Sequence, residues 1–147
     1  MKILFVITGS IAVSKCYDIL NALKKNKIQV SCIITNNAKK LLNTSKINQN
    51  ISGKIYTDRS EKKEKMLHIN LSRKNNLIVV CPSTANTIAK FAKGYGDNLA
   101  STTLLASNKP IIFIPAMNTM MWNNPINKKN VQYLQTIGVD FIGPKIG

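Results

Sequence analysis

The chain has 147 residues, 44% of them hydrophobic, and its 21 basic and 6 acidic residues give a formal net charge of +15. This length suits one domain with a single core, and no apolar stretch approaches the ~20 residues that a membrane helix needs. The chain starts directly on a strand-like pattern instead of a targeting sequence, so we expect a cytoplasmic protein without a membrane partner.

The positive charge comes almost entirely from lysine, with Arg59 and Arg73 as the two exceptions. No Arg-rich helix, aromatic stacking motif or zinc-finger spacing accompanies it, so we interpret the charge as a solvated basic surface and do not expect nucleic-acid binding. Cys16, Cys32 and Cys81 lack a Cys-x-x-Cys spacing. They predict reduced, buried thiols and no metal site.

The first part of the chain alternates between strand-like and helix-like segments. Apolar runs predict buried strands, apolar periodicity predicts helices, and polar residues between them predict turns and helix caps. In chain order the pattern predicts a strand at 2–8, a helix at 11–23, a strand at 28–34 and a short helix at 38–42.

Residues 43–65 interrupt this alternation because Asn, Ser, Lys and Gly replace the apolar pattern. Lys62, Lys63 and Lys65 add a charged run. The composition predicts a mobile surface loop here.

The alternation resumes after this segment. It predicts a strand at 77–81, a helix at 84–93, a turn at 94–97, a helix ending at 106, a strand at 111–114, a helical face at 131–137 and a strand at 139–142. Strands separated by helices imply right-handed crossovers. We therefore expect an α/β protein with a Rossmann-like open parallel sheet and helices on both faces.

Small polar residues follow several predicted strands, where open α/β sheets bind ligands. Gly9 and Ser10 make a strand-to-helix turn that is either a plain turn or a phosphate site at a helix N-terminus. It is neither the Gly-x-Gly-x-x-Gly fingerprint nor a P-loop. Thr35 and Asn36 likewise serve either as caps or as phosphate ligands, and so do the hydroxyls and amide of residues 83–87.

Two further residues are candidates for chemistry. His68 is the single histidine, and it is either structural or a proton-transfer group, because its ordinary pKa lies near neutrality. Asn118 follows a predicted strand within residues 115–122, Pro-Ala-Met-Asn-Thr-Met-Met-Trp. The Met and Trp of this run are typical of core packing, whereas the amide suits a substrate carboxylate.

Four stretches together resemble the homo-oligomeric flavin-containing cysteine decarboxylases, and most closely the phosphopantothenoylcysteine decarboxylases of coenzyme A synthesis. They are the Gly-Ser-Ile-Ala turn at 9–12, the His-Ile-x-Leu segment from His68, residues 82–99 and residues 115–122. The resemblance implies a flavoprotein domain over residues 1–147 that uses FMN to decarboxylate 4′-phosphopantothenoylcysteine to 4′-phosphopantetheine.

The resemblance also implies roles for individual residues. His68 would be the catalytic base, Asn118 would hold the substrate carboxylate and Met121 would lie near the substrate. It implies a homotrimer or dodecamer with the active site at the boundary between subunits. The residues implied to contact FMN are Gly9, Ser10, Ile11, Thr35, Asn36, Thr84, Ala85, Asn86, Thr87 and Ala116.

Family members continue beyond the Gly-Pro stretch at 143–147 into an Ala-Cys-Gly flap, and bacterial relatives often carry a synthetase domain. We expect this sequence to end before the flap and to lack the synthetase domain, which would impair completion of the decarboxylation. A non-catalytic flavin-binding scaffold or degraded flavoprotein therefore stays open, and a flavin prenyltransferase is the third alternative.

Overall fold

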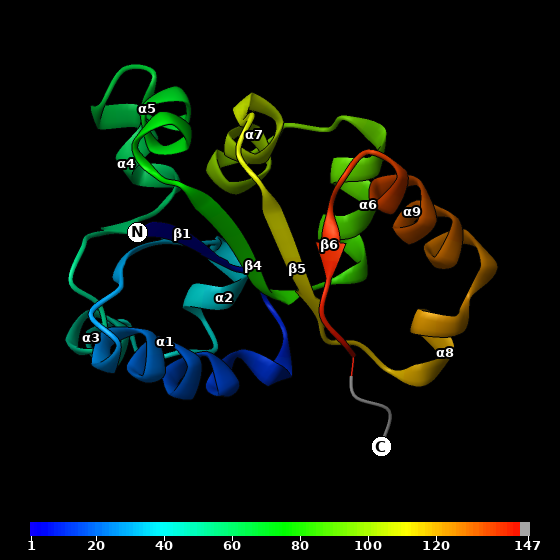
Figure 1. Ribbon diagram of the computed structural model, residues 1–147, viewed down its shortest axis with the longest axis horizontal. Coiled ribbons are helices and arrows are strands. Elements are labelled where there is room, and N and C mark those ends of the chain that lie inside the picture. Colours follow the sequence, from blue (N-terminus) through cyan, green and yellow to red (C-terminus); the bar gives the residue numbers. More distant parts are fainter. Residues whose placement is uncertain (145–147) are drawn as a thin grey trace.

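The computed structural model describes residues 1–144, and in that range all six strands lie parallel in one sheet of order β3-β2-β1-β4-β5-β6. Figure 1 shows the sheet running through the middle of the molecule. The strands are β1 Lys2–Ile7, β2 Gln29–Ile34, β3 Ile55–Tyr56, β4 Leu77–Ser83, β5 Ile111–Pro115 and β6 Asp140–Phe141. The expected Rossmann-like α/β fold is therefore confirmed.

Helices cover both faces of this sheet because successive strand side chains point to opposite sides. Leu4 and Val6 of β1 face one core, and Ile3, Phe5 and Ile7 face the other. The first core is closed by α5 Leu67–Lys74, α6 Ala85–Lys93, α7 Leu99–Ala106 and α9 Pro125–Thr136 (Figure 1). The second is closed by the 3-10 helix η1 Ile11–Ser14, α1 Lys15–Lys25, α2 Asn36–Lys39 and α3 Thr44–Gln49.

The strand order reverses between β1 and β4, so their carboxyl ends diverge into a crevice. Chain segments leave these two strands toward opposite faces: η1 and α1 follow β1, and α6 follows β4. Open α/β sheets bind ligands at such a switch point. The fold therefore places the turn after Ile7 and the turn after Ser83 where a ligand is expected.

The prediction of a mobile surface loop over residues 43–65 is wrong. This stretch contains α3, β3 and α4 Asp58–Lys63. Ile47 and Ile51 are buried against the sheet, and the Asn43 side chain caps α3 by accepting a hydrogen bond from Lys46 N. Two buried apolar residues and a cap are enough to order a segment whose composition is that of a loop.

Other boundaries differ by a few residues. The helix predicted at 11–23 begins as η1 and continues as α1 to Lys25, and the short helix predicted at 38–42 lies at Asn36–Lys39. One more short helix, α8 Thr119–Asn123, follows β5. No helix within residues 1–144 is long and apolar enough to cross a membrane. The last three residues of the Gly-Pro stretch at 143–147 lie outside the described part of the chain.

Candidate functional site

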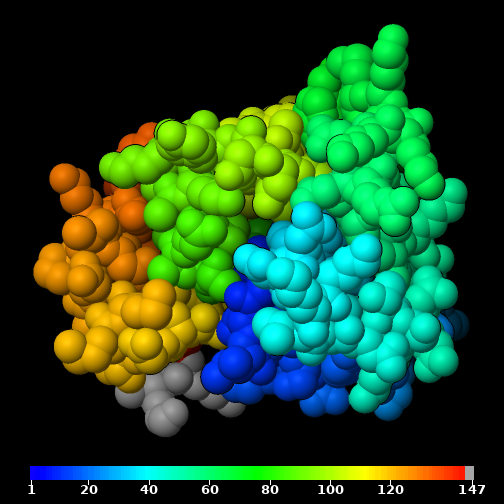
Figure 2. Space-filling view, turned by 180° about the vertical axis from the view of Figure 1, so that it is seen from behind, coloured from blue at the N-terminus to red at the C-terminus, as the bar shows by residue number. Residues whose placement is uncertain are grey.

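A polar cavity of about 180 Å³ lies at the switch point, between the carboxyl ends of β1, β2 and β4. Figure 2 shows the surface here, where the blue segment after β1, the cyan α2 and the green α6 meet. Its lining consists of small hydroxyl and amide side chains and one lysine, namely Thr8, Gly9, Thr35, Asn37, Thr84, Asn86, Thr87, Lys90, Asn98, Ala100 and Ser101.

Gly9 lets two chain segments approach each other beside this cavity. A Cβ atom at Gly9 would lie 2.6 Å from Asn37 Cβ, which is closer than real Cβ contacts allow, and 3.1 Å from the Asn37 carbonyl carbon, which is tighter than most. Only glycine fits here without moving α2. The turn after β1 is therefore part of the cavity wall, and its glycine cannot be replaced without moving the neighbouring segment.

Three hydroxyl side chains cap the N-termini of helices around the cavity. Ser10 Oγ accepts a hydrogen bond from Ala12 N at 3.2 Å, Thr35 Oγ1 from Ala38 N at 3.3 Å, and Thr84 Oγ1 from Thr87 N at 3.2 Å. The capping interpretation is thus correct for all three. Each capping hydroxyl still has a hydrogen to donate. At Thr84 the Oγ1 atom also lies 3.0 Å from Thr87 Oγ1, and either of these two hydroxyls is the donor in that contact.

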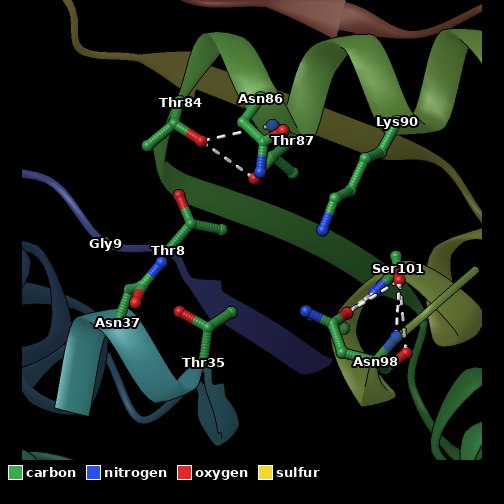
Figure 3. Close-up of a pocket in the computed structure, with 11 residues that line it drawn as sticks. Thr8, Gly9, Thr35, Asn37, Thr84, Asn86, Thr87, Lys90, Asn98 and Ser101 are labelled. Atoms are coloured by element: carbon green, nitrogen blue, oxygen red, sulfur yellow. Dashed lines mark hydrogen bonds between the residues drawn. The ribbon is translucent and has the colours of Figure 1, made fainter. Parts of the chain in front are cut away.

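Lys90 carries the only charge among the described residues that line this cavity. Figure 3 shows its side chain reaching from α6 across the cavity toward Asn98 and Ser101. Its Nζ lies 3.0 Å from Asp97 Oδ1, and Ser101 Oγ donates to the same carboxylate oxygen at 3.2 Å. The hydrogen bond from Lys90 is the main reason that the pKa of Asp97 lies below its ordinary value.

His68 does not line the cavity. It lies in the first turn of α5, and its Nδ1 is 3.0 Å from Glu61 Oε1 of α4. When Nδ1 is the protonated nitrogen, it donates to the carboxylate and leaves Nε2 as an acceptor. Both side chains are about one third exposed or less, at 27% for His68 and 33% for Glu61.

Asn118 begins α8, and its Oδ1 accepts a hydrogen bond from Met121 N at 2.9 Å. Its Nδ2 is left to donate to another group. Met121 lines a separate groove of about 270 Å³ between α6 and α9, which also contains Ala85. Ala116 lines a third cavity, of about 540 Å³, beside α1. Ala85, Ala116, Asn118 and Met121 therefore lie around the crevice but do not line the 180 Å³ cavity.

The three cysteines lie close together on the α1 side of the sheet and are free thiols. Cys16 Sγ donates to the carbonyl oxygen of Cys81 at 3.2 Å. A hydrogen bond between the two side chains raises the pKa of Cys16 and lowers that of Cys81, while burial raises the pKa of Cys32 to about 12. Cys81 also lines the 540 Å³ cavity, together with Lys15.

The structure therefore brings together only part of the predicted site. Gly9, Thr35, Thr84, Asn86 and Thr87 share one cavity. The remaining predicted residues lie elsewhere, and Ile11 is 95% exposed. Those outside the cavity are Ser10, Ile11, Asn36, His68, Ala85, Ala116, Asn118 and Met121.

Sequence reasoning missed several residues of the site: Thr8, Asn37, Glu61, Lys90, Asn98 and Ser101. Lys90 and Asn98 lie inside the motif at 82–99, so the motif itself carried a signal for them. Glu61 carried none, because it precedes His68 across a turn at Met66 in the left-handed conformation.

Comparison with known proteins gives a consistent result. A family model described as Flavoprotein matches residues 1–147. The chain is 33% identical over 148 residues to the probable phosphopantothenoylcysteine decarboxylase of Streptococcus mutans, covering 98% of this chain and 83% of the relative. It is 35% identical over 149 residues to the coenzyme A biosynthesis bifunctional protein CoaBC of Vibrio vulnificus, covering 99% of this chain but only 37% of that relative.

Solved structures share the fold. A cysteine-to-serine mutant of PPC decarboxylase, complexed with pantothenoylaminoethenethiol, matches with a TM-score of 0.89 and 32% identity, over 98% of this chain and 82% of the other. The FMN binding protein AtHal3 matches with a TM-score of 0.89 and 32% identity, over 98% and 80%.

Proposed function

The chain belongs to the flavoprotein family, and from this membership we propose that it binds FMN and decarboxylates 4′-phosphopantothenoylcysteine to 4′-phosphopantetheine in coenzyme A synthesis. The observation that carries the proposal is the polar cavity at the switch point, to which two of the four stretches that resemble the decarboxylases, residues 9–12 and 82–99, contribute. The similarity to a probable phosphopantothenoylcysteine decarboxylase over 83% of its length supports the same reaction.

The lining of the cavity fits the polar end of FMN. Helix N-termini and hydroxyl and amide donors favour a phosphate and a sugar-alcohol chain. Among the described residues no carboxylate lines this cavity, and Asp58 and Asp97 line another cavity beside it. Lys90 supplies one positive charge, which it shares with Asp97 at 3.0 Å. Cofactor sites usually measure about 300–1,000 Å³, so a cavity of about 180 Å³ holds the phosphate end and leaves the ring system to extend beyond it.

The chemistry is divided between cofactor and protein. When bound, FMN would take two electrons from the cysteine part of the substrate, which makes loss of carbon dioxide easy, and would return them to the decarboxylated product, so that the overall reaction is redox-neutral. We assign His68 as the base that accepts the substrate proton at Nε2, with Glu61 fixing the ring through Nδ1. The Nδ2 of Asn118 is free to donate to the substrate carboxylate, and Met121 bounds the same region.

We also propose that the active site is completed by a second copy of the chain, in a trimer or a dodecamer. His68 does not line the cavity that we assign to the phosphate end of FMN, so one chain by itself does not join the base to that cavity. Exposed apolar side chains near Asn118 suit a subunit contact: Met120 is 83% exposed, Met121 45% and Ile126 73%. Light scattering with bound FMN tests this, and a monomer with full flavin occupancy would contradict it.

The alternatives receive less support. The matched relatives and structures are decarboxylases or FMN proteins, which does not favour a non-catalytic scaffold or a flavin prenyltransferase. The three thiols are free, as is typical of a reducing compartment, and we propose that the reaction takes place in the cytoplasm.

The direct test is product analysis with FMN-loaded protein. We expect the FMN-loaded protein to release carbon dioxide from 4′-phosphopantothenoylcysteine, and mass spectrometry of the amount of 4′-phosphopantetheine formed with it measures whether the decarboxylation is completed. The His68→Asn variant serves as the matched control because it keeps the FMN cavity intact. Bound FMN without any turnover of the substrate would reject the activity while leaving the cofactor assignment in place.

A further inference from the structure

A second polar cavity lies at the amino ends of the strands, opposite the carboxyl ends that form the first cavity, and near the N-terminus marked in Figure 1. We call it the amino-edge cavity. Its volume is about 320 Å³, and Lys2 and Gln29, the first residues of β1 and β2, lie in its wall. The FMN cavity begins at Thr8, which follows β1 and lies six residues after Lys2, or about 20 Å at the rise of a strand. The two cavities are therefore separate sites.

Three lysines line this amino-edge cavity: Lys2, Lys54 and Lys74. Within residues 1–144 none of the six acidic residues lines it, and the ion pairs in that range involve other residues. The surplus of lysine in the chain does not by itself account for the cluster. The 180 Å³ cavity has one lysine, and the 540 Å³ cavity has one lysine together with Asp18.

One effect opposes an anion at this edge. The C-terminus of α5 ends at Lys74, and a helix C-terminus carries the equivalent of roughly half a negative charge. Lys74 in the last turn is enough to offset that charge. Glu64 acts on Tyr56 from outside the lining and offsets one further charge, which leaves the electrostatic balance of the three lysines positive.

The neutral lining residues are suited to a ligand with both polar and apolar parts. Asn75 is only 6% exposed and uses Nδ2 to donate to Leu71 O at 2.7 Å, which leaves its second amide hydrogen for a ligand. Ser31 Oγ accepts from Lys54 N at 3.3 Å and keeps its own hydrogen. Burial, and then Glu64, raise the pKa of Tyr56, so its phenol stays a neutral donor. The Tyr56 ring and Leu71 supply an apolar wall.

We propose that the amino-edge cavity binds a small phosphorylated ligand, with its phosphate groups among the three lysines and an apolar or aromatic part against Tyr56 and Leu71. Lysine is a point charge that binds phosphate without bidentate geometry, which suits a group of flexible side chains. The volume falls in the range of ordinary small-molecule sites. This site is independent of the FMN site and of the decarboxylation.

ADP and inorganic pyrophosphate are suitable probes, because they share the phosphate groups and differ in the aromatic part. We expect calorimetric titration of the FMN-loaded protein to show saturable binding of both, tighter for ADP and weaker at higher salt. Lys54→Gln should weaken ADP binding at least about fivefold. Lys62→Gln removes the same charge from an exposed position on α4 and should change binding less than about twofold.

Two checks separate the site from general charge effects. Unchanged flavin content and melting temperature of the Lys54→Gln protein show that any loss of binding is local. Equal weakening by Lys54→Gln and Lys62→Gln would overturn the proposal, as would release of FMN by ADP or the absence of saturable binding at low salt.

Discussion

His68 Nδ1 and Glu61 Oε1 lie 3.0 Å apart, joining the first turn of α5 to α4. The carboxylate fixes the orientation of the imidazole and favours the tautomer in which Nε2 is unprotonated and able to accept a proton. Glu61 lies in the stretch 43–65, whose composition is that of a loop. It thus orients His68, which we assign as the base.

Replacing Glu61 tests this relationship. Glu61→Gln should slow the reaction with 4′-phosphopantothenoylcysteine about tenfold, whereas His68→Asn should slow it by about 10²–10⁴, the usual contribution of a general base. FMN affinity should not change in either variant, because neither residue lines the FMN cavity. Stopped-flow absorbance measures the rate. Glu64→Gln is the matched control, and an equal loss in that variant would refute the role of Glu61.

The close approach of Gly9 and Asn37 predicts a steric effect on cofactor binding. Gly9→Ala places a Cβ 2.6 Å from Asn37 Cβ, which should destabilise the fold by about 1–3 kcal/mol and weaken FMN binding at least about tenfold. Flavin fluorescence titration and thermal unfolding measure the two effects. Adding Asn37→Gly removes one of the clashing atoms and should restore part of the loss. No change in FMN affinity in Gly9→Ala would show that this turn does not contact the cofactor.

Thr84 should contribute to both stability and cofactor binding. Thr84→Ala removes the cap on Thr87 N and should lower the free energy of unfolding by about 1 kcal/mol. It also removes a hydroxyl donor from the cavity, so FMN affinity should fall as well. Thr84→Ser keeps the hydroxyl and should preserve most of both properties. Denaturant unfolding and FMN titration of the two variants provide the comparison. Identical FMN affinities of Thr84→Ala and Thr84→Ser would mean that the hydroxyl acts only as a cap.

The three thiols should react at different rates in the native protein. Cys81 has a lowered pKa and lines an open cavity, whereas the pKa values of Cys16 and Cys32 are raised. Because the thiolate is the reactive form, iodoacetamide should modify Cys81 first. Peptide mass spectrometry over time reveals the order, with the unfolded protein as control. Earlier modification of Cys32 would contradict the prediction.

Much of the fold could be predicted because the strands are apolar runs, buried on both faces in 77–81 and buried on one face and half-buried on the other in 111–114. The segment at 43–65 could not, because its order depends on the burial of Ile47 and Ile51 against distant strands. The residues of the FMN cavity were predicted where they follow strand ends in a motif, as Gly9 and Thr84 do. The pairing of Glu61 with His68 is a tertiary contact across a turn and leaves no periodic signal in the sequence.

The visible absorption of the purified, FMN-reconstituted protein tests the proposed activity most directly. On adding 4′-phosphopantothenoylcysteine without oxygen, we predict that the flavin band bleaches within the first turnover, because electrons pass from the substrate to the flavin before they return to the product. A flavin band that stays unchanged with saturating substrate would contradict the decarboxylase assignment, and a protein that cannot be loaded with FMN would contradict the cofactor assignment as well.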